Sequence, residues 1–382
     1  PGSGSDALGA RTTARLTPDG THYLLNGSKL YITNAAFADI FIVYAKVDGD
    51  HFTAFIVERG TPGFTVGPEE KKMGIKGSST CPLFFEDAPV PVGNVLGEVG
   101  KGHLIAFNIL NIGRFKLGAG CVGTAKEAIA LAASYAAGRK QFGRPIASFP
   151  LIGEKLADMN IAAFVTESIV YRTAGLIDER LATADPNALD AGAQAAKAIA
   201  EYALECSIVK VFATEALDFI ADEGVQIHGG YGYIQEYKIE RIYRDSRINR
   251  IFEGTNEINR MLIPGTLMKK ALKGELPLMR KARALQEELL QPMPLPSFED
   301  TLSLESYRLG QAKKTFLAVG GAAVQKLGLR LEQEQEVLVA LADIMIGIYA
   351  MESAILRVRK LIAGSGEARA ENTIQMTTGF VQ

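Results

Sequence analysis

The sequence lacks an excess of charge of either sign. Its 382 residues include 41 lysines and arginines against 43 aspartates and glutamates. Proteins that bind nucleic acid or anionic membranes as their main partner usually carry a basic excess, so neither partner is expected. Histidine is also scarce: the 4 histidines show no metal-ligand spacing. We therefore predict no metal site.

Cysteine and long apolar runs are equally limited. Cys81, Cys121 and Cys206 are far apart and odd in number, which favours reduced, buried thiols in a reducing compartment over a disulfide framework. The longest apolar run, 337–350, contains Asp343 and is too short to span a bilayer. We therefore predict no transmembrane segment.

The chain does have the length for two or three domains and the composition of an ordered, helix-rich protein, with 47% hydrophobic residues. It opens at Pro1 without an initiator methionine and stops just after a possible helix start. We interpret it as a fragment that lacks sequence at the front and at the back.

Residues 1–97 have the pattern of a β domain. Tight turns are expected at Pro18-Asp19-Gly20 and at Asn26-Gly27, the second as a type I′ hairpin. Pro89 and Pro91 are expected to stop the last strand. Short strands at this spacing predict an antiparallel barrel or sandwich; they are expected at 23–25, 30–33, 40–47, 52–57 and 83–85.

From residue 98 the hydrophobic period becomes helical. Long helices are expected at 104–135, 151–181 and 190–220, which predicts an antiparallel four-helix bundle over 98–275. A proline-rich linker is expected at 276–300. Two amphipathic helices, 304–327 and 331–362, then predict an additional, incomplete helical domain at 301–382. We assign that domain a structural or oligomerisation role.

Arginines recur at every third position from 241 to 250, and acidic residues interrupt them at 240 and 245. In a neutral protein this pattern favours a salt-bridged helix with partly buried arginines over a nucleic-acid patch.

Glu253 is the candidate base. It follows the apolar pair Ile251-Phe252 and precedes Gly254. Thr255 or Asn256 can cap a following helix that ends at Pro264-Gly265. A carboxylate held on such a turn can point into a cavity and accept a proton. The alternative is a surface glutamate stabilised by the helix dipole.

The opening Gly2-Ser3-Gly4-Ser5 is a weak dinucleotide-fold signal, because strands and turns follow it instead of a long helix. The loop can bind phosphate through its backbone N–H groups and the Ser5 hydroxyl. A flexible linker is the alternative.

Six motifs, taken together and in order, resemble the acyl-CoA dehydrogenase family, most closely its very-long-chain-type bacterial branch. They cover residues 1 to about 265, and the helical tail is also a feature of the very-long-chain type. The motifs are Pro1-Gly2-Ser3-Gly4-Ser5-Asp6, Tyr31-Ile32-Thr33-Asn34, Asn111-Ile112-Gly113-Arg114, Arg139-Lys140-Gln141-Phe142-Gly143, Gln226-Ile227-His228-Gly229-Gly230 and Phe252-Glu253-Gly254-Thr255-Asn256-Glu257.

The resemblance implies an α+β multidomain fold: an antiparallel β domain, an antiparallel four-helix bundle and the helical tail, with the family's N-terminal helical domain missing. It implies FAD as cofactor and α,β-desaturation of long-chain acyl-CoA thioesters to trans-2-enoyl-CoA in fatty-acid β-oxidation. It also implies an electron-transfer flavoprotein as electron acceptor, a homodimer, and a location in the bacterial cytoplasm or, in a eukaryote, the mitochondrial matrix.

By the same resemblance Glu253 removes the substrate's α-proton while hydride passes to the flavin. A glutamate with an ordinary pKa of about 4.3 is a weak base in water, and an apolar, ligand-filled pocket raises that pKa. Some relatives carry the base at the position of Gly113, which cannot act as one, so Glu253 is the only candidate compatible with the family.

The resemblance also assigns the binding residues. Arg114 is expected to orient Glu253 or the substrate, with a helix-face ion pair as the alternative. Tyr31 takes the place of a tryptophan found in many relatives, and Arg139 with Phe142 is expected to reach the cofactor across a subunit interface. The substrate-binding residues are Ser5, Asn111, Arg114, Phe252 and Gly254; the cofactor-binding residues are Ser5, Tyr31, Ile32, Thr33, Arg139, Phe142, Gln226, Ile227, His228, Gly229, Gly230, Thr255, Asn256 and Glu257.

Two other functions remain open at this point. An acyl-CoA oxidase is built on the same plan with an added helical tail, and it lets oxygen reach the reduced flavin. An assembly or interaction protein could keep the fold without the chemistry, although the intact Glu253 and cofactor motifs argue against it.

Overall fold

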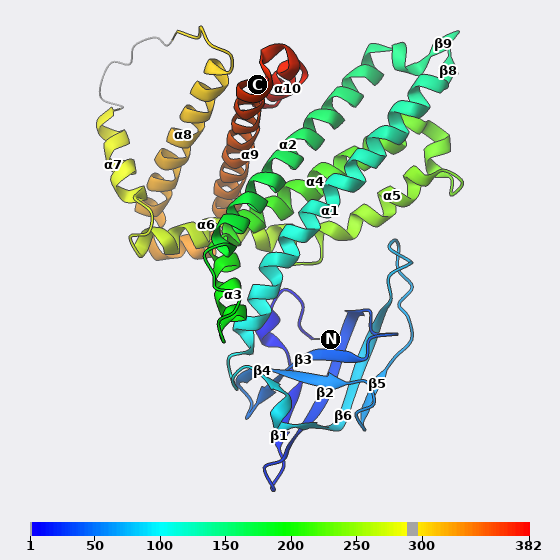
Figure 1. Ribbon diagram of the computed structural model, residues 1–382, viewed down its shortest axis with the longest axis vertical. Helices are drawn as coiled ribbons and strands as arrows, with labels where there is room; N and C mark the ends of the chain where they lie inside the picture. The colour runs from blue at the N-terminus through cyan, green and yellow to red at the C-terminus, as the bar shows by residue number, and fades with distance from the viewer. Residues whose placement is uncertain (1, 289–296) are drawn as a thin grey trace. The chain divides into compact units, whose positions relative to one another are not determined.

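The computed structural model describes residues 2–288 and 297–382 (Figure 1). The chain divides into two compact units, Pro1–Leu110 and Asn111–Gln382. Each is described by itself below.

The first unit is built on a seven-stranded sheet with the strand order β5-β6-β2-β1-β3-β4-β7. All its pairings are antiparallel except β1 with β3, which is parallel. That pair departs from the fully antiparallel sheet expected. The strands are Thr13–Leu16 (β1), His22–Thr33 (β2), Ile40–Val47 (β3), His51–Glu58 (β4), Phe64–Val66 (β5), Thr80–Pro91 (β6) and Val95–Leu96 (β7).

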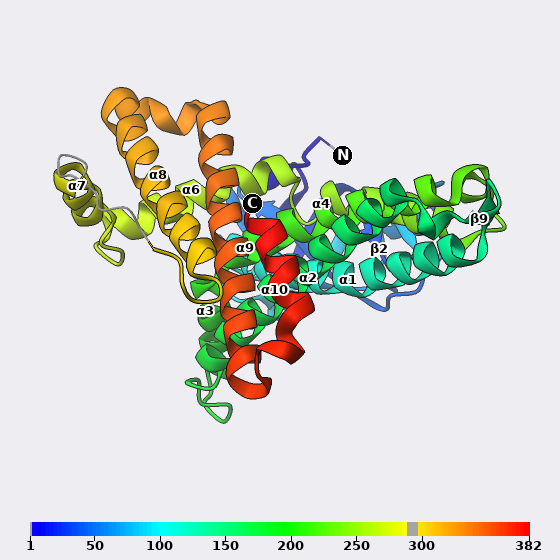
Figure 2. The ribbon, with the colours of Figure 1, turned by 90° about the horizontal axis from the view of Figure 1, so that it is seen from above.

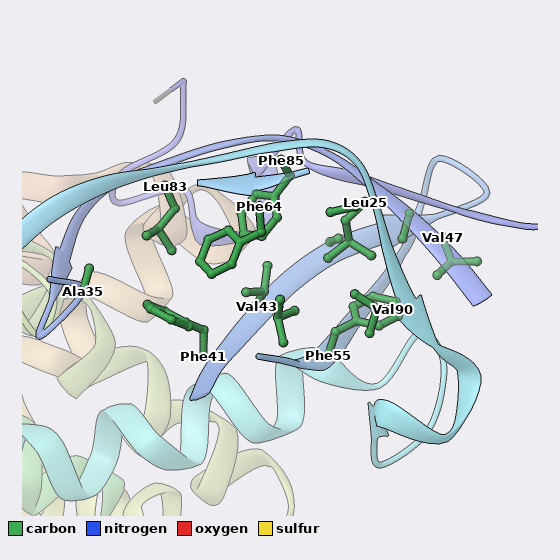
Figure 3. Packing of buried hydrophobic residues seen from close by; sticks show 14 of the residues in the cluster. Leu25, Ala35, Phe41, Val43, Val47, Phe55, Phe64, Leu83, Phe85 and Val90 are labelled. Carbon is green, nitrogen blue, oxygen red and sulfur yellow. The ribbon is translucent and has the colours of Figure 1, made fainter. Parts of the chain in front are cut away.

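Alternating apolar side chains from these strands form the core of the sheet (Figure 3). In β3, for example, every second residue is buried, from Phe41 through Val43 and Ala45 to Val47, while the residues that alternate with them are more exposed, the period expected of a strand with one buried face. Phe64 contacts both Phe41 and Phe85, with 4.9 Å between ring centroids in each pair. These aromatic contacts join side chains of β3, β5 and β6 in the core.

Two sequence-based expectations about this sheet are wrong. Asn26-Gly27 is not a hairpin: it lies inside β2, where the register against β6 shifts between Leu25 and Gly27. Gly27 has a φ of +135°, a positive value that favours glycine. The glycine that predicted a turn therefore serves a bulge within the strand. Pro89 does not stop β6 either. β5 pairs with β6 only as far as Phe85, so the later part of β6 has a free edge that tolerates a missing N–H.

The second unit contains a helical bundle with a helical tail, as the resemblance implies (Figure 1). Side chains of α1, α2, α4 and α5 share one buried cluster, and α6 packs against α4. The expected helix 190–220 is interrupted at Tyr202, which separates α3 from α4. The helices are Gly102–Gly138 (α1), Pro150–Leu181 (α2), Ala191–Glu201 (α3), Ala203–His228 (α4), Lys238–Ser246 (α5) and Asn256–Leu272 (α6); a small hairpin, Lys140–Gln141 (β8) with Arg144–Pro145 (β9), joins α1 to α2.

The arginine-rich segment forms α5 and the 3-10 turn Arg247–Arg250. Arg244 pairs with Glu240 at 2.7 Å and Arg250 with Asp218 at 3.3 Å, and both arginines are partly buried. The expected salt-bridged helix is confirmed at these two positions, whereas Arg241 and Arg247 are exposed.

The tail contains three helices, Ser303–Leu327 (α8), Gln335–Ser365 (α9) and Glu367–Val381 (α10), and α9 packs against both of the others (Figure 2). The linker expected at 276–300 is partly wrong, because Leu278–Glu288 is a helix (α7) that buries Leu285. Residues 289–296 of that linker lie outside the described residues.

Helix α9 is long and apolar enough to cross a membrane by length and composition alone. This corrects the expectation that its apolar run is too short. Core helices pass the same test, and α9 also packs against α2, α4 and α6, with Leu338, Leu341 and Met345 buried. Its contacts favour the role of a core helix of the tail.

The three cysteines are buried and free, as expected. Burial raises the pKa of the Cys121 and Cys206 thiols to about 12. Cys81 lies in the core of the sheet with 1% of its surface exposed.

Candidate active site

The turn that carries Glu253 lies between the 3-10 turn Arg247–Arg250 and helix α6. Glu253 and Gly254 are both left-handed, with φ of +57° and +77°. That conformation is costly for a glutamate, so the surroundings must hold it in place. Thr255 is the N-cap: its hydroxyl accepts the Ile258 N–H at 3.2 Å. The predicted cap is thus confirmed, but α6 continues through Pro264 to Leu272 and does not end at Pro264-Gly265.

Side chains from three helices bind the carbonyl groups of this turn. Arg114 Nε on α1 donates to the Glu253 carbonyl at 3.2 Å. Lys210 Nζ on α4 donates to the Gly254 carbonyl at 2.7 Å. Asn259 Nδ2 on α6 donates to the Gly254 and Thr255 carbonyls at 2.9 and 3.0 Å. The cationic donors therefore bind the backbone of the turn.

One oxygen of the Glu253 carboxylate has no such partner. Its Oε2 is buried and makes no hydrogen bond with the residues that the structure describes. Burial raises the pKa of Glu253, while Arg114, Lys210 and Lys116 oppose that shift through their positive charge. A partly desolvated carboxylate with an elevated pKa is a competent general base. The burial argues against the surface-glutamate alternative.

Gly113 on α1 makes room for this carboxylate. A Cβ at position 113 would lie 2.5 Å from Glu253 Oε2 and 2.9 Å from Cδ. Gly113 thus faces the carboxylate of the candidate base. Its lack of a side chain is a steric requirement of the site.

Asn111 and Arg114, the two predicted substrate residues on α1, lie together and are both buried. Arg114 Nη1 donates to Asn111 Oδ1 at 3.3 Å. Burial lowers the pKa of Arg114, and the nearby Glu253 opposes that shift. Arg114 binds the backbone carbonyl of Glu253, a contact through which it could orient that residue as predicted. Phe252 and Gly254 flank the base on the same turn, and Phe252 is 38% exposed.

Lys210 and Asn259 are not among the residues predicted for the site. Both are fully buried, at 0% exposure. Lys210 could have been noticed because it interrupts the apolar run Ile208-Val209-Lys210-Val211-Phe212, and a lysine buried in such a run needs a polar partner. Asn259 carries no comparable signal, since an asparagine one turn into a helix is ordinary.

Several predicted cofactor residues of the second unit line one cavity of about 520 Å³. Arg139, His228 and the Gly229-Gly230 backbone contribute to its wall. Nothing lies within 4 Å of where a Cβ would be at either glycine, so their backbone faces open space. The Arg139 guanidinium group in this wall suits a phosphate-bearing ligand, whereas the Gly229 N–H already donates to the Gln226 and Val225 carbonyls at the end of α4. The other lining residues are Tyr135, Gln141, Ile146, Ile227, Tyr231 and Ile234.

His228 is held in one orientation within this wall. Its Nδ1 lies 2.7 Å from the Gly224 carbonyl and its ring stacks on Tyr135. Burial lowers the pKa of His228, which favours the neutral ring. Gln226 and Phe142 are among the predicted residues outside the lining: Gln226 is exposed, and Phe142 is 92% exposed with a left-handed φ of +52°.

The predicted cofactor residues of the first unit differ in exposure. Ser5 and Thr33 are exposed, and Tyr31 is 70% exposed with a left-handed φ of +60°. The Ile32 side chain packs against the sheet core. The Tyr31 ring is therefore accessible to a ligand, whereas the Ile32 side chain contributes to the core of the sheet.

The residues after the base contribute mainly to the turn itself. Thr255 caps α6, and Asn256 is 3% exposed with its amide bound to Lys210, Thr214 and Glu215. Glu257 is exposed, and hydrogen bonds lower its pKa. No group of three or more His, Cys, Asp or Glu side chains within 2–288 and 297–382 is placed to hold a metal ion.

Three family models match the chain. Residues 1–88 match the acyl-CoA dehydrogenase middle domain, residues 100–268 match an acyl-CoA dehydrogenase C-terminal domain, and residues 311–382 match a second model of that description.

Named proteins match along the whole chain. The chain is 58% identical over 382 residues to the "Probable acyl-CoA dehydrogenase" of Bacillus subtilis (strain 168), covering 100% of this chain and 64% of that protein. It is 40% identical to the human very long-chain specific acyl-CoA dehydrogenase, mitochondrial, covering 98% and 59%. The crystal structure of an acyl-CoA dehydrogenase complexed with FAD from Bacillus anthracis superposes with a TM-score of 0.98 at 59% identity, covering 100% and 65%. The chain thus spans about three fifths of the length of these relatives.

Proposed function

The chain belongs to the acyl-CoA dehydrogenase family, and from that premise we propose that it carries the base and part of the cofactor site of an FAD-dependent acyl-CoA dehydrogenase. The reaction is the α,β-desaturation of long-chain acyl-CoA thioesters to trans-2-enoyl-CoA in fatty-acid β-oxidation. The observation that carries this proposal is the buried Oε2 of Glu253, which has no hydrogen-bond partner in the described part of the chain. It lies on a turn whose carbonyls are held by Arg114, Lys210 and Asn259.

Glu253 takes the proton from the carbon next to the thioester carbonyl. Its raised pKa brings it closer to the weakly acidic C–H it must deprotonate. Gly113 leaves the carboxylate its space, and Arg114 holds the carbonyl of the same residue. The carboxylate therefore receives the proton from a fixed position while a double bond forms between the α- and β-carbons.

The β-carbon must lose hydride in the same reaction, and no side chain can accept it. FAD, when bound, supplies the acceptor. The Arg139 guanidinium group in the wall of the second unit's cavity supports binding of a phosphate-bearing part. In the first unit, the exposed Tyr31 ring supports stacking on an aromatic ligand. The FAD complex of the Bacillus anthracis relative supports the choice of cofactor.

We further propose that the whole protein is a homodimer that passes its electrons to an electron-transfer flavoprotein in the bacterial cytoplasm. The length preference is supported by the match to the very long-chain specific human relative, which extends through the helical tail.

The test is the Glu253→Gln variant of the flavin-loaded, full-length protein. Under anaerobic conditions a saturated long-chain acyl-CoA should bleach the wild-type flavin, whereas the variant should bind the substrate but reduce flavin at least about 1,000-fold more slowly, because an amide cannot accept the proton. Glu236→Gln, at an exposed position before α5, is the matched control and should behave as wild type. Normal bleaching in Glu253→Gln would refute the assignment, and peroxide release during aerobic turnover would reassign the protein as an oxidase.

A further inference from the structure

Lys210 lies in the middle of α4, and its surroundings are unusual for a lysine. Its neighbours Val209 and Val211 are buried, and its own exposure is 0%. Burying an ammonium group is costly unless its charge and its donors are matched. The contacts it makes should therefore explain its presence.

The Lys210 ammonium group binds two residues that follow Glu253, one in the turn and one at the start of α6. It donates to the Gly254 carbonyl at 2.7 Å and to Asn256 Oδ1 at 2.6 Å. Gly254 directly follows the base, and Asn256 is the first residue of α6. One buried group thus connects the base's own turn to the helix that follows it.

Asn256 extends this connection away from the turn. Its Nδ2 donates to Glu215 Oε1 at 2.9 Å, and Arg260 donates to both oxygens of Glu215 at 2.6 and 2.9 Å. Arg260 Nε also donates to Asp343 of α9 at 2.7 Å. The turn is therefore continuous, through hydrogen bonds, with the helical tail.

We propose that Lys210 is a positioning residue for the Glu253 base: it fixes the turn through the Gly254 carbonyl, and its buried charge favours the ionised carboxylate. This inference rests on the proposed function of Glu253. A purely structural role fits poorly, because an apolar side chain of similar length would fill the same space in α4 without burying a charge.

The charges around both groups are consistent with this role. Burial and the neighbouring Arg114 lower the pKa of Lys210 to about 8, opposed by Glu257, Cys121 and Glu215. Lys210 is thus mostly protonated at neutral pH. The groups that act on Glu253 are Arg114 and Lys116 of α1 and Lys210 of α4. Removing Lys210 leaves the two α1 cations in place, so the effect on Glu253 should be partial.

The experiment compares Lys210→Met with wild type in the flavin-loaded, full-length protein. We expect flavin reduction by saturated long-chain acyl-CoA to slow by about 10- to 100-fold at saturating substrate, because the base is less well held. The acid limb of the pH–rate profile, below which the rate falls, should move to higher pH by roughly 0.5–1 unit. The reason is that loss of the positive charge of Lys210 raises the pKa of Glu253. The melting temperature should stay within a few degrees of wild type, since removal of the buried charge offsets the loss of two hydrogen bonds.

Lys155→Met is the matched control, because Lys155 of α2 binds Glu223 at 2.5 Å and, in the described part of the chain, donates no hydrogen bond to the turn. It should leave the rate and the acid limb unchanged. If Lys210→Met does not fold, Lys210→Gln, which also removes the charge, should show the same shift of the limb.

The outcomes separate this inference from the proposed function. If Lys210→Met leaves both the rate and the acid limb unchanged, the positioning role is overturned. It is also overturned if the rate falls while the acid limb stays in place and the melting temperature drops strongly, because that result indicates a purely structural role. Activity that survives Glu253→Gln would instead overturn the proposed function itself.

Discussion

Substitution of Gly113 by alanine tests the geometry of the site most directly. The new Cβ would lie 2.5 Å from Glu253 Oε2, 2.9 Å from Cδ and 3.1 Å from Oε1. Ordinary contact begins near 3.4 Å, so the carboxylate must retreat by about 0.9 Å. Displacements of roughly 1 Å cost about 100-fold in rate when a reacting group must be aligned. We therefore expect Gly113→Ala to slow flavin reduction about 100-fold while the substrate still binds.

The assay is anaerobic stopped-flow reduction of the bound flavin by a saturated long-chain acyl-CoA. Exchange of the substrate's α-proton with deuterated solvent reports on the base separately from the flavin. Both rates should fall together in Gly113→Ala, because the same carboxylate governs them.

Two other glycines of α1 provide matched controls. A Cβ at Gly120 or Gly123 meets nothing within 4 Å. Alanine at either position should leave the rate unchanged and stabilise the helix by about 0.5–1 kcal/mol. A folded Gly113→Ala protein with the wild-type rate would show that the Glu253 carboxylate is not working from the position described here.

Two further predictions follow from the same turn. Because burial raises the pKa of Glu253 and the base must be ionised, kcat/KM should fall as the pH drops through a value above the usual glutamate pKa of about 4.3; an acid limb at or below that value would contradict the burial argument. Thr255→Ala removes the acceptor for the Ile258 N–H and should destabilise the protein by about 1 kcal/mol, seen as a lower melting temperature, whereas Thr255→Ser keeps the acceptor and should not; equal melting temperatures for both variants would show that the cap contributes nothing.

The helices were the most predictable part of the fold. The sequence predicts α2 at 151–181 and the structure has Pro150–Leu181, because a long apolar stripe of period 3.6 is a strong signal. Local breakers were less informative. Pro264 lies inside α6, where packing against α4 and α9 keeps the helix going despite the missing N–H. Asn26-Gly27 forms a bulge, because its strand continues against β6 on either side.

The candidate site was predictable at its centre and not around it. The position of Glu253 between apolar residues and a helix start pointed to a base. Its left-handed turn, however, is held by Arg114 of α1 and Lys210 of α4, which are 139 and 44 residues away in the chain from the carbonyls that they bind. No local pattern encodes such contacts. Lys210 leaves a local signal as a lysine within an apolar run, but the carbonyl that it binds is apparent only once α4 packs beside the turn, and Asn259 leaves no local signal at all.

The buried state of Cys81, Cys121 and Cys206 gives the folded protein the behaviour of a cysteine-free background. Thiols with a pKa of about 12, such as those of Cys121 and Cys206, carry almost no thiolate at neutral pH. A maleimide dye offered to the native protein should therefore react only at a cysteine introduced on the surface. Labelling of the natural thiols would then report unfolding that exposes them to solvent.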